Sequence, residues 1–265
     1  MENQTKETAL ITGATKGIGY ELTKLFARDS YNLVLIARDA KKLNEIKTDL
    51  NNEYNIDILI IVKDLSKPNA ALEIFNETVE KQIVINVLVN NAGIGDFGRF
   101  QKQDFLKINE ILQINIVSLT ELTRLFMSNM LMKKKGQILN ISSMAAFQPG
   151  PYMAVYYASK AYVQSFSEAI TSELKGTGVS VTTLCPGPTK SGFQKEVGSE
   201  NSNLVKYKLL SSSEEVAKDG YKALQTGKEI EIPGLLYSSL FNTSKIIPRK
   251  AKTRIIKKLQ ELNRN

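Results

Sequence analysis

Histidine is absent from this chain of 265 residues, and cysteine occurs only once, at Cys185. The absence of histidine excludes nucleophilic sites built on Ser-His-Asp or Cys-His groups. With a single thiol left, a zinc site made of the usual ligands is not expected, and we predict no metal. One cysteine also excludes an internal disulfide, which agrees with a reducing compartment. Acid–base chemistry therefore falls to tyrosine, lysine or carboxylates.

Long apolar runs are missing as well. No segment of the sequence approaches the ~20 apolar residues that a helix needs to cross a bilayer. Residues 1–7 are polar and lack the apolar stretch of a signal peptide. The chain has no repeat, linker or low-complexity segment, and its length suits one large α/β domain. We therefore expect a single-domain protein in the cytoplasm.

Acidic residues are scarce in one region, the C-terminal tail. The formal net charge is +8, and residues 244–265 carry eight basic side chains against one acidic residue, Glu261. The tail therefore accounts for +7, and the rest of the chain is close to neutral. A nearly neutral body argues against a nucleic-acid-binding face across the domain.

Apolar, β-branched runs alternate with segments of helical period along the chain. The expected strands are Thr8–Thr12, Leu33–Ala37, Ile56–Val62, Ile85–Asn90, Gly136–Ile141, Val179–Cys185 and Glu229–Ile232. The expected helices are Ile18–Arg28, Ala40–Asn52, Ala70–Lys81, Asp104–Lys133, Val155–Lys175 and Ser213–Gln225. Strict alternation of this kind is typical of parallel strands joined by right-handed crossovers. The sequence thus predicts an α/β fold of the Rossmann type, a doubly wound parallel sheet of about seven strands with helices on both faces.

A glycine-rich turn follows the first expected strand. It reads Thr12-Gly13-Ala14-Thr15-Lys16-Gly17-Ile18-Gly19, and a helix begins within it. Glycines allow the backbone to approach a pyrophosphate, which the N-terminus of a helix stabilises. The alternative is a glycine turn without a ligand, but its place between the first strand and the first helix favours dinucleotide binding. The expected cofactor contacts here are Gly13, Thr15, Lys16, Gly17, Ile18 and Gly19.

The end of the second strand bears on the choice between NADP(H) and NAD(H). An acidic residue at this point would bind the ribose 2′-hydroxyl, whereas an arginine accommodates a 2′-phosphate. Ala37 stands at the strand end and Arg38 follows, with Lys16 as a second positive charge. Asp39 could face the ribose instead, and both basic side chains could simply be solvated. We predict NADP(H), with NAD(H) as the less favoured cofactor.

Tyr156 and Lys160 are four residues apart and therefore share one face of an expected helix. The Tyr-x-x-x-Lys pattern is weak by itself, because a second copy occurs at Tyr20 and Lys24. That second copy has no partner residues placed to assist it. Tyr156 differs because Ser143, thirteen residues upstream, ends the fifth strand at the expected ligand edge of the sheet.

Two further features complete a family pattern. Asn90-Asn91-Ala92-Gly93 ends the fourth strand, and Asn115 lies inside a long expected helix. With them, the sequence resembles the short-chain dehydrogenase/reductase family in its compact branch. The match is collinear over residues 7–232 and comprises Thr12–Gly19, Asp64, Asn90–Gly93, Asn115, Ser143, Tyr156, Lys160 and Pro186-Gly187. The resemblance implies hydride transfer between a nicotinamide and a carbonyl or alcohol.

The resemblance also implies roles for the catalytic residues. Tyr156 would exchange a proton with the substrate oxygen, and Ser143 would bind that oxygen and stabilise its developing charge. Lys160, together with the oxidised nicotinamide, would lower the pKa of the tyrosine from its usual value of about 10. Lys160 would also bond the nicotinamide ribose, and Asn115 would hold a water that connects Lys160 to solvent.

Further cofactor contacts implied by the resemblance lie at the ends of other strands. Asp64 would bond the adenine, and Asn91, Ala92 and Gly93 would line the cofactor cleft. After Pro186 and Gly187 the family usually has a threonine five residues beyond the proline, which binds the carboxamide. This chain has Ser191 there and Thr189 two residues earlier, so either hydroxyl is a candidate.

Apolar residues gather around the expected catalytic group. Residues 188–210 form a long stretch suited to a mobile lid, and it includes Phe193. Met144, Phe147 and Met153 lie between Ser143 and Tyr156 in the sequence. Together they suggest a pocket for a hydrophobic ketone, a 3-oxoacyl group or a steroid-like substrate. The alternative is that these side chains pack the lid or a subunit contact.

The tail contains an apolar stripe at helical spacing, flanked by lysine and arginine. Its residues are Ile247, Ala251, Ile255, Leu259 and Leu262. Such a helix could make weak peripheral contact with an anionic membrane, or dock on the domain or on a neighbouring subunit, which we favour. We assign residues 1–233 to the NADP-binding catalytic domain and residues 234–265 to a basic C-terminal extension of it.

The main rival function is a non-catalytic dinucleotide-binding regulator. It predicts a degraded Ser/Tyr/Lys set, whereas the set here is intact. A sugar-nucleotide epimerase would have a larger C-terminal region and different glycine spacing. We therefore expect an enzyme, a homodimer or homotetramer, that acts on a small carbonyl or alcohol and has no nucleic-acid partner.

Overall fold

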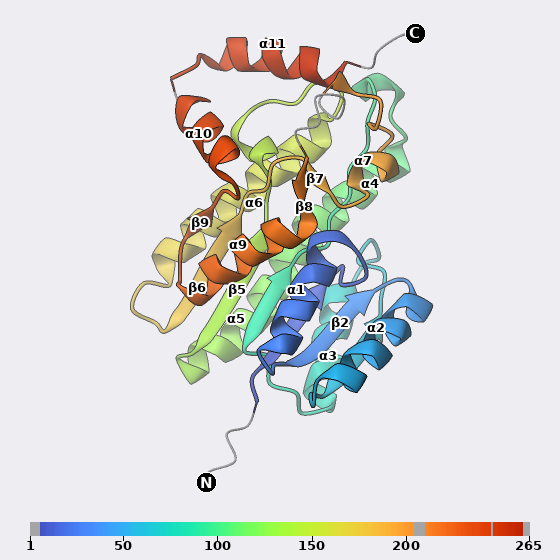
Figure 1. The fold of residues 1–265 in the computed structure, drawn as a ribbon, viewed down its shortest axis with the longest axis vertical. Helices are drawn as coiled ribbons and strands as arrows, with labels where there is room; N and C mark the ends of the chain where they lie inside the picture. Colours follow the sequence, from blue (N-terminus) through green and yellow to red (C-terminus); the bar gives the residue numbers. More distant parts are fainter. Residues whose placement is uncertain (1–5, 204–209, 245, 262–265) are drawn as a thin grey trace.

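A parallel sheet of seven strands forms the centre of the molecule, in the order β3-β2-β1-β4-β5-β6-β9 (Figure 1). The computed structural model describes residues 6–203, 210–244 and 246–261. The strands are β1 (Thr8–Thr12), β2 (Asn32–Ala37), β3 (Ile58–Val62), β4 (Val87–Asn90), β5 (Gly136–Ile141), β6 (Val179–Leu184) and β9 (Ile230–Glu231). Every neighbouring pair in this sheet is parallel. The predicted fold class is confirmed.

Helices cover both faces of the sheet (Figure 1). One face carries α1 (Gly17–Arg28), α2 (Ala40–Glu53) and α9 (Ser213–Gln225). The other face carries α3 (Ala70–Glu80), α5 (Leu119–Lys133) and α6 (Ala154–Glu173). Successive strand residues serve opposite faces: Ile11 and Leu35 belong to the first core, and Leu10 and Val34 to the second. Both faces are therefore buried, which explains the nearly continuous apolar strands.

The single helix expected over Asp104–Lys133 is interrupted by a wider turn. Asp104 caps α4 (Phe105–Leu112) by accepting a bond of 2.9 Å from the Leu106 N–H. A π-helical segment, η2 (Gln113–Ser118), then leads into α5. Short π-helical segments occur often at functional sites. This one contains Asn115.

The first part of the expected lid, residues 188–210, has structure of its own. β7 (Thr189–Lys190) pairs with β8 (Ser211–Ser212) as a small parallel sheet, and α7 (Phe193–Glu196) follows β7. Residues 204–209 lie outside the described residues. Two short 3₁₀ segments complete the core fold, η1 (Phe100–Lys102) and η3 (Met144–Phe147).

The C-terminal tail lies beyond the carboxyl ends of the strands, at the top of Figure 1. It forms α10 (Leu235–Ser244) and α11 (Arg249–Gln260). Gln260 donates a hydrogen bond of 2.9 Å to the Tyr157 hydroxyl of α6, and Asn203 donates one of 3.0 Å to the Lys258 carbonyl. The described part of the tail thus docks on the domain; Leu262 of the expected stripe lies outside the described residues. Within those residues, no helix combines the length and the apolar character needed to cross a bilayer.

Candidate active site

The glycine turn forms one wall of a cleft at the carboxyl edge of the sheet. Gly13 and Gly17 have φ angles of 67° and 56°, in the left-handed region that favours glycine. A Cβ on Gly19 would lie 2.3 Å from the Gly13 carbonyl oxygen, so only glycine lets α1 begin this close to the turn. Lys16, at the N-cap of α1, makes no side-chain capping bond, which leaves the first N–H groups of the helix for a ligand. The turn therefore fits a pyrophosphate.

Gly19→Ala should lower the free energy of unfolding by about 2 kcal/mol, because the new methyl group overpacks against backbone. The gain in helix propensity, about 1 kcal/mol, does not offset this clash. Ser172→Ala is the control, since it changes an exposed helix position of α6 without adding bulk against backbone. Urea unfolding measures both variants. An equal loss in the two would show that the approach at Gly19 is not tight.

The end of β4 is fastened to the glycine turn. The Asn91 amide donates to the Thr12 and Gly13 carbonyls at 2.9 and 3.1 Å. The Thr12 hydroxyl oxygen accepts from the N–H groups of Asn91 and Ala92, both at 3.0 Å. Beyond them, a Cβ on Gly93 would lie 3.2 Å from Lys160 Nζ, so glycine leaves room for the ammonium group.

Two positive charges stand near the end of β2, as the sequence suggested. Burial, and next the positive charge of Arg38, lower the pKa of Lys16, so the two side chains are close enough to interact. The Asp39 carboxylate caps α2 by accepting a 2.9 Å bond from the Lys42 N–H. Lys16 also pairs with Glu196 of α7, a contact that the sequence did not reveal.

Asp64 remains an ionised carboxylate at the end of β3. Its burial would raise the pKa, but bonds from Ser66 and the positive charges of Arg38 and Lys67 outweigh this and lower it. One carboxylate oxygen accepts a bond of 3.0 Å from the Ser66 N–H.

The cleft itself has a volume of about 430 Å³ and runs from the glycine turn to the tail. Most of the expected cofactor residues line it. They are Gly13, Lys16, Gly17, Ile18, Asn91, Ala92, Gly93, Tyr156, Lys160, Pro186, Gly187, Thr189 and Ser191. The expected residues outside this lining are Thr15, Gly19, Arg38 and Asp64.

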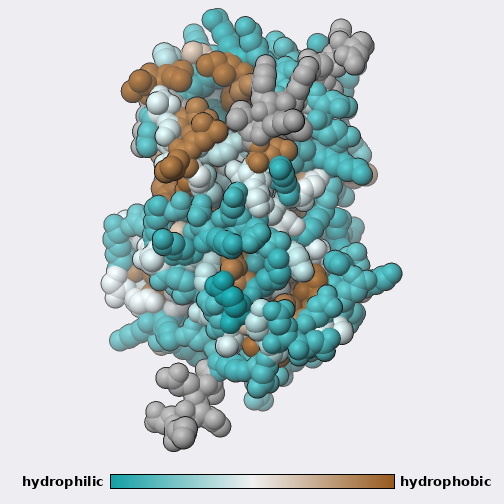
Figure 2. Space-filling model, in the orientation of Figure 1, coloured by the Kyte–Doolittle hydropathy of each residue, from teal (hydrophilic) through white to brown (hydrophobic). Residues whose placement is uncertain are grey.

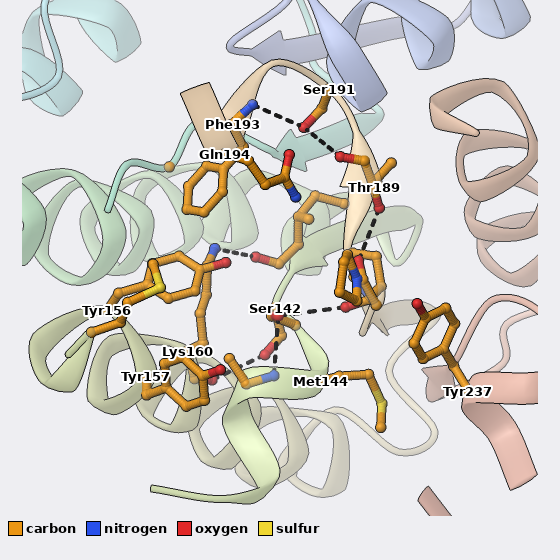
Figure 3. Close-up of a pocket in the computed structure, with 18 of the residues that line it drawn as sticks. Ser142, Met144, Tyr156, Tyr157, Lys160, Thr189, Ser191, Phe193, Gln194 and Tyr237 are labelled. Carbon is orange, nitrogen blue, oxygen red and sulfur yellow. Dashed lines mark hydrogen bonds between the residues drawn. The ribbon is translucent and has the colours of Figure 1, made fainter. Parts of the chain in front are cut away.

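Ser143, Tyr156 and Lys160 converge in the cleft, with Tyr156 and Lys160 on the same side (Figure 3). Ser143 follows β5, and its hydroxyl oxygen accepts a 3.1 Å bond from the Ala145 N–H. A hydrogen bond joins the Ser143 and Tyr156 side chains. Lys160 Nζ donates a 2.8 Å bond to the Ile141 carbonyl and lies 5.9 Å from the centre of the Tyr156 ring. Two hydroxyl groups and one ammonium group therefore share one end of the cleft.

Asn115 lies behind this group rather than in the lining. Its amide oxygen accepts from the Ile94 N–H at 3.0 Å, and its nitrogen donates to the Ile94 carbonyl and the Ser159 hydroxyl, each at 2.9 Å. These bonds fix the segment after β4 against α6. The water contact expected for Asn115 stays a prediction.

Burial is the largest influence on the pKa of both Tyr156 and Lys160. It raises the pKa of the Tyr156 phenol, while the hydrogen bond from Ser143 opposes the rise. Burial also lowers the pKa of Lys160 to about 8. The expected lowering of the tyrosine pKa by Lys160 is therefore not produced by the chain alone, which keeps the phenol protonated and fit to donate a proton.

The two candidate carboxamide ligands both line the cleft. The Thr189 hydroxyl donates to the Gly187 carbonyl at 2.9 Å. Ser191 makes longer bonds of 3.4 Å, to the Thr189 carbonyl and from the Phe193 N–H. The hydroxyl of Ser191 is thus held less firmly, and the choice between the two remains open.

Of the expected substrate residues, Met144, Met153 and Phe193 line the cleft together with Ser143. The Phe193 ring of α7 packs against the Tyr156 ring, with 5.1 Å between their centres. Phe147 is the exception, because its ring turns to Phe241 of α10, with 4.5 Å between centres. The ring is therefore outside the cleft lining, and its role as a substrate contact stays a prediction.

The sequence interpretation missed the part of the wall that comes from the tail. Tyr237 lies across the cleft from Tyr156 and Lys160 (Figure 3). Its ring explains Gly187, since a Cβ there would lie 2.5 Å from ring atoms. From α11, Ile256 and Gln260 also line the cleft. The apolar stripe of the tail was the only sequence signal for this wall, and it did not indicate which surface it would cover.

A doubly wound sheet with a phosphate-binding turn beside a Ser-Tyr-Lys group is the arrangement of nicotinamide-dependent oxidoreductases. The family model described as short chain dehydrogenase matches residues 7–202. The chain therefore belongs to the short-chain dehydrogenase family.

Two curated relatives and one solved structure show the similarity in detail. The chain is 34% identical over 186 residues to a very-long-chain 3-oxoacyl-CoA reductase of Anas platyrhynchos, covering 67% of this chain but only 58% of that reductase. It is 28% identical over 228 residues to a 7beta-hydroxysteroid dehydrogenase of Mediterraneibacter gnavus, covering 85% of each. A short-chain dehydrogenase from Sphingobium yanoikuyae in complex with NADPH has a TM-score of 0.82 and 25% identity, covering 98% of each chain.

Proposed function

We propose that this protein catalyses reversible hydride transfer between NADP(H) and a carbonyl or alcohol, with a hydrophobic ketone as the carbonyl substrate. The observation that carries the proposal is the convergence of Ser143, Tyr156 and Lys160 in the cleft that begins at the glycine turn. When bound, the cofactor supplies or accepts the hydride. The chain supplies the binding groups and the proton.

In the reductive direction, the Ser143 and Tyr156 hydroxyls bind the carbonyl oxygen by hydrogen bonds. Tyr156 then gives its phenolic proton to that oxygen as negative charge develops on it. The ammonium group of Lys160, 5.9 Å from the ring centre, stabilises the phenolate that forms. In the oxidative direction, the same phenolate accepts the proton of the alcohol. Asn115 positions the segment that borders Lys160.

The preference for NADP(H) rests on Arg38 and Lys16. Both are basic and near each other, and Asp39 is occupied as a helix cap. A 2′-phosphate would be stabilised by two positive charges with no competing carboxylate from Asp39. The relative from Sphingobium yanoikuyae, which binds NADPH, supports this choice. NAD(H) remains the less favoured cofactor.

Arg38→Ala should raise the Kd for NADPH by about 10- to 100-fold, because a charge-assisted bond to the 2′-phosphate is lost. The Kd for NADH should change by less than about twofold, since NADH has no such phosphate. Lys41→Ala, three residues along the chain, removes an exposed charge as a control. Fluorescence titration with both cofactors measures the ratio. An unchanged NADPH-to-NADH ratio in Arg38→Ala would overturn the NADP(H) proposal.

The substrate proposal rests on the apolar wall formed by Met144, Met153 and Phe193. The two curated relatives act, by their names, on 3-oxoacyl-CoA and hydroxysteroid compounds, both with large apolar parts.

We further propose that the protein is a cytoplasmic homodimer or homotetramer, with residues 1–233 as the catalytic domain and residues 234–265 as its extension. NADPH oxidation, measured with ketones, aldehydes and 3-oxoacyl thioesters, tests the activity. Failure of every class to consume NADPH would overturn it.

A further inference from the structure

Large apolar side chains are exposed along the C-terminal tail. Leu235 at the start of α10 is 90% exposed, and Ile246 between α10 and α11 is 86% exposed. Leu236 and Leu240 are each about half exposed. Figure 2 shows the apolar surface gathered at this end of the molecule, over α10 and the beginning of α11. A patch of this kind marks a surface that contacts an apolar partner.

Positive charge borders the patch. Residues 232–260 include seven lysines and arginines and no acidic residue. On α11, the exposed basic side chains are Arg249, Lys250, Arg254, Lys257 and Lys258. Within the described residues, none of these five forms an ion pair. The surface therefore combines exposed leucine and isoleucine with a dense, unneutralised positive charge.

The apolar stripe read from the sequence is not this surface. Ile247, Ile255 and Leu259 of the stripe line the cleft. Next to them on α11, Gln260 is bonded to Tyr157. The inner face of α11 is thus occupied by the domain. What remains outside is the basic face of α11 together with the leucines of α10 and Ile246.

We propose that this surface, defined by Leu235, Leu236, Ile246 and the basic face of α11, docks on an anionic lipid membrane. Apolar side chains enter the interface between headgroups and acyl chains, while lysine and arginine pair with anionic headgroups. A second copy of the chain fits less well, because a symmetric contact would bring the same positive charges together. A lipid surface supplies both the apolar layer and the negative charge that this end of the molecule lacks.

The position of the cleft suggests a role for membrane docking in substrate entry, and this role rests on the proposed function. Leu240 of α10 and Ile255 of α11 line the cleft, yet they are 47% and 48% exposed. The cleft therefore reaches the surface between the two helices. A hydrophobic ketone dissolved in the membrane would enter the cleft from this side without passing through water.

Co-sedimentation of the full-length protein with vesicles tests the inference. We expect at least about tenfold more binding to phosphatidylcholine vesicles containing one-third phosphatidylserine than to phosphatidylcholine alone at low salt. Added salt should reduce the binding, because the Debye length falls from about 10 Å at 0.1 M to about 3 Å at 1 M. Equal binding to both vesicles, or no binding, would overturn the proposal.

Two variants locate the contact. The triple change Leu235→Ser, Leu236→Ser, Ile246→Ser should reduce binding at least about fivefold, because it removes the apolar insertion. Its control replaces exposed apolar residues elsewhere, Phe100, Phe105 and Leu106, with serine.

The second variant reverses three charges of α11, Arg249→Glu, Lys250→Glu and Arg254→Glu, and it should abolish the preference for anionic vesicles. Its control reverses three exposed lysines outside the tail, Lys81, Lys102 and Lys133. If tail and control variants lose binding equally, the contact is not on the tail.

Two further readouts separate this inference from the proposed function. NADPH oxidation with a water-soluble ketone and no vesicles should be unchanged by the triple serine variant, because none of its three residues lines the cleft. In the unmodified chain, turnover without vesicle binding would overturn the membrane inference alone, and vesicle binding without turnover would overturn the function alone. Analytical sedimentation without lipid tests whether a second copy of the chain binds this surface instead of a membrane. If the serine variant lowers the oligomeric mass and no vesicle binding occurs, the surface joins copies of this chain instead.

Discussion

Tyr156→Phe should lower kcat by about 10²- to 10⁴-fold, because the phenolic proton is the one that the substrate oxygen receives. The Kd for NADPH should stay within about threefold, since only one hydroxyl at one end of the cleft is removed. The phenol is buried, and burial raises its pKa, so it is a proton donor throughout the neutral range. Steady-state turnover and cofactor titration of the same preparation measure the two effects separately.

Tyr20→Phe is a sharp control for this variant, because it repeats the Tyr-x-x-x-Lys pattern. Lys24 Nζ lies 5.0 Å from the centre of the Tyr20 ring, even closer than Lys160 lies to that of Tyr156. A nearby ammonium group therefore does not distinguish the two tyrosines. Tyr156 differs by its place in the cleft and its bond to Ser143. Tyr20→Phe should leave kcat unchanged, and normal turnover by Tyr156→Phe would assign the acid to another group.

The fold could be predicted because strand period, helix period and glycine placement all indicate the same topology. Apart from the interrupted helix over Asp104–Lys133, the errors in the expected strands and helices lie at their ends. Strands were expected to begin at Ile56 and Ile85, but β3 begins at Ile58 and β4 at Val87. Ile56 and Ile85 are both buried outside the sheet ladder. An apolar residue predicts that its side chain is buried, but residues beyond the ends of the paired strands are buried as well.

The catalytic group could also be predicted, because each of its residues follows a strand or shares a helix face. Contacts between segments that are distant in the sequence could not be predicted. The ion pair of Lys16 with Glu196 joins residues 180 apart in the chain, and Gln260 meets Tyr157 across 103 residues. Phe147 carries no local sign that its ring will pack on Phe241 of the tail. Apolar character predicts that such side chains are covered, but not by which segment.

The pKa of Lys160 likewise depends on how deeply the side chain is buried, which the spacing of residues in the sequence does not predict. Its pKa of about 8 lies below the ordinary value of 10.5 because the ammonium group is fully buried. A lysine whose folded pKa is lowered makes the fold less stable while it is charged. This cost is complete below pH 8 and disappears as the pH rises from about 8 to 10.5. The difference between the two pKa values corresponds to about 3 kcal/mol.

Lys160→Met should therefore separate activity from stability. Turnover should fall by at least about 10²-fold, because the charge beside Tyr156 is lost. At pH 7 the variant avoids the cost of about 3 kcal/mol for the buried charge. It also loses the bond to the Ile141 carbonyl, which costs about 1–2 kcal/mol. We expect a net gain of about 1–2 kcal/mol in the free energy of unfolding at pH 7.

The pH dependence gives the stricter test, because comparison with the unmodified chain cancels every other titrating group. The advantage of Lys160→Met should shrink from pH 8 upward and become a disadvantage by about pH 10.5, where the unmodified lysine is neutral in the folded state and half neutral in the unfolded state. Lys24→Met is the control, since a bond to Glu21 raises the pKa of this lysine and its contribution has the opposite sign. Urea unfolding at a series of pH values measures all three proteins. Parallel curves for Lys160→Met and the unmodified chain would mean that Lys160 is as well solvated in the folded state as in the unfolded state, and that its charge at the active site costs the fold nothing.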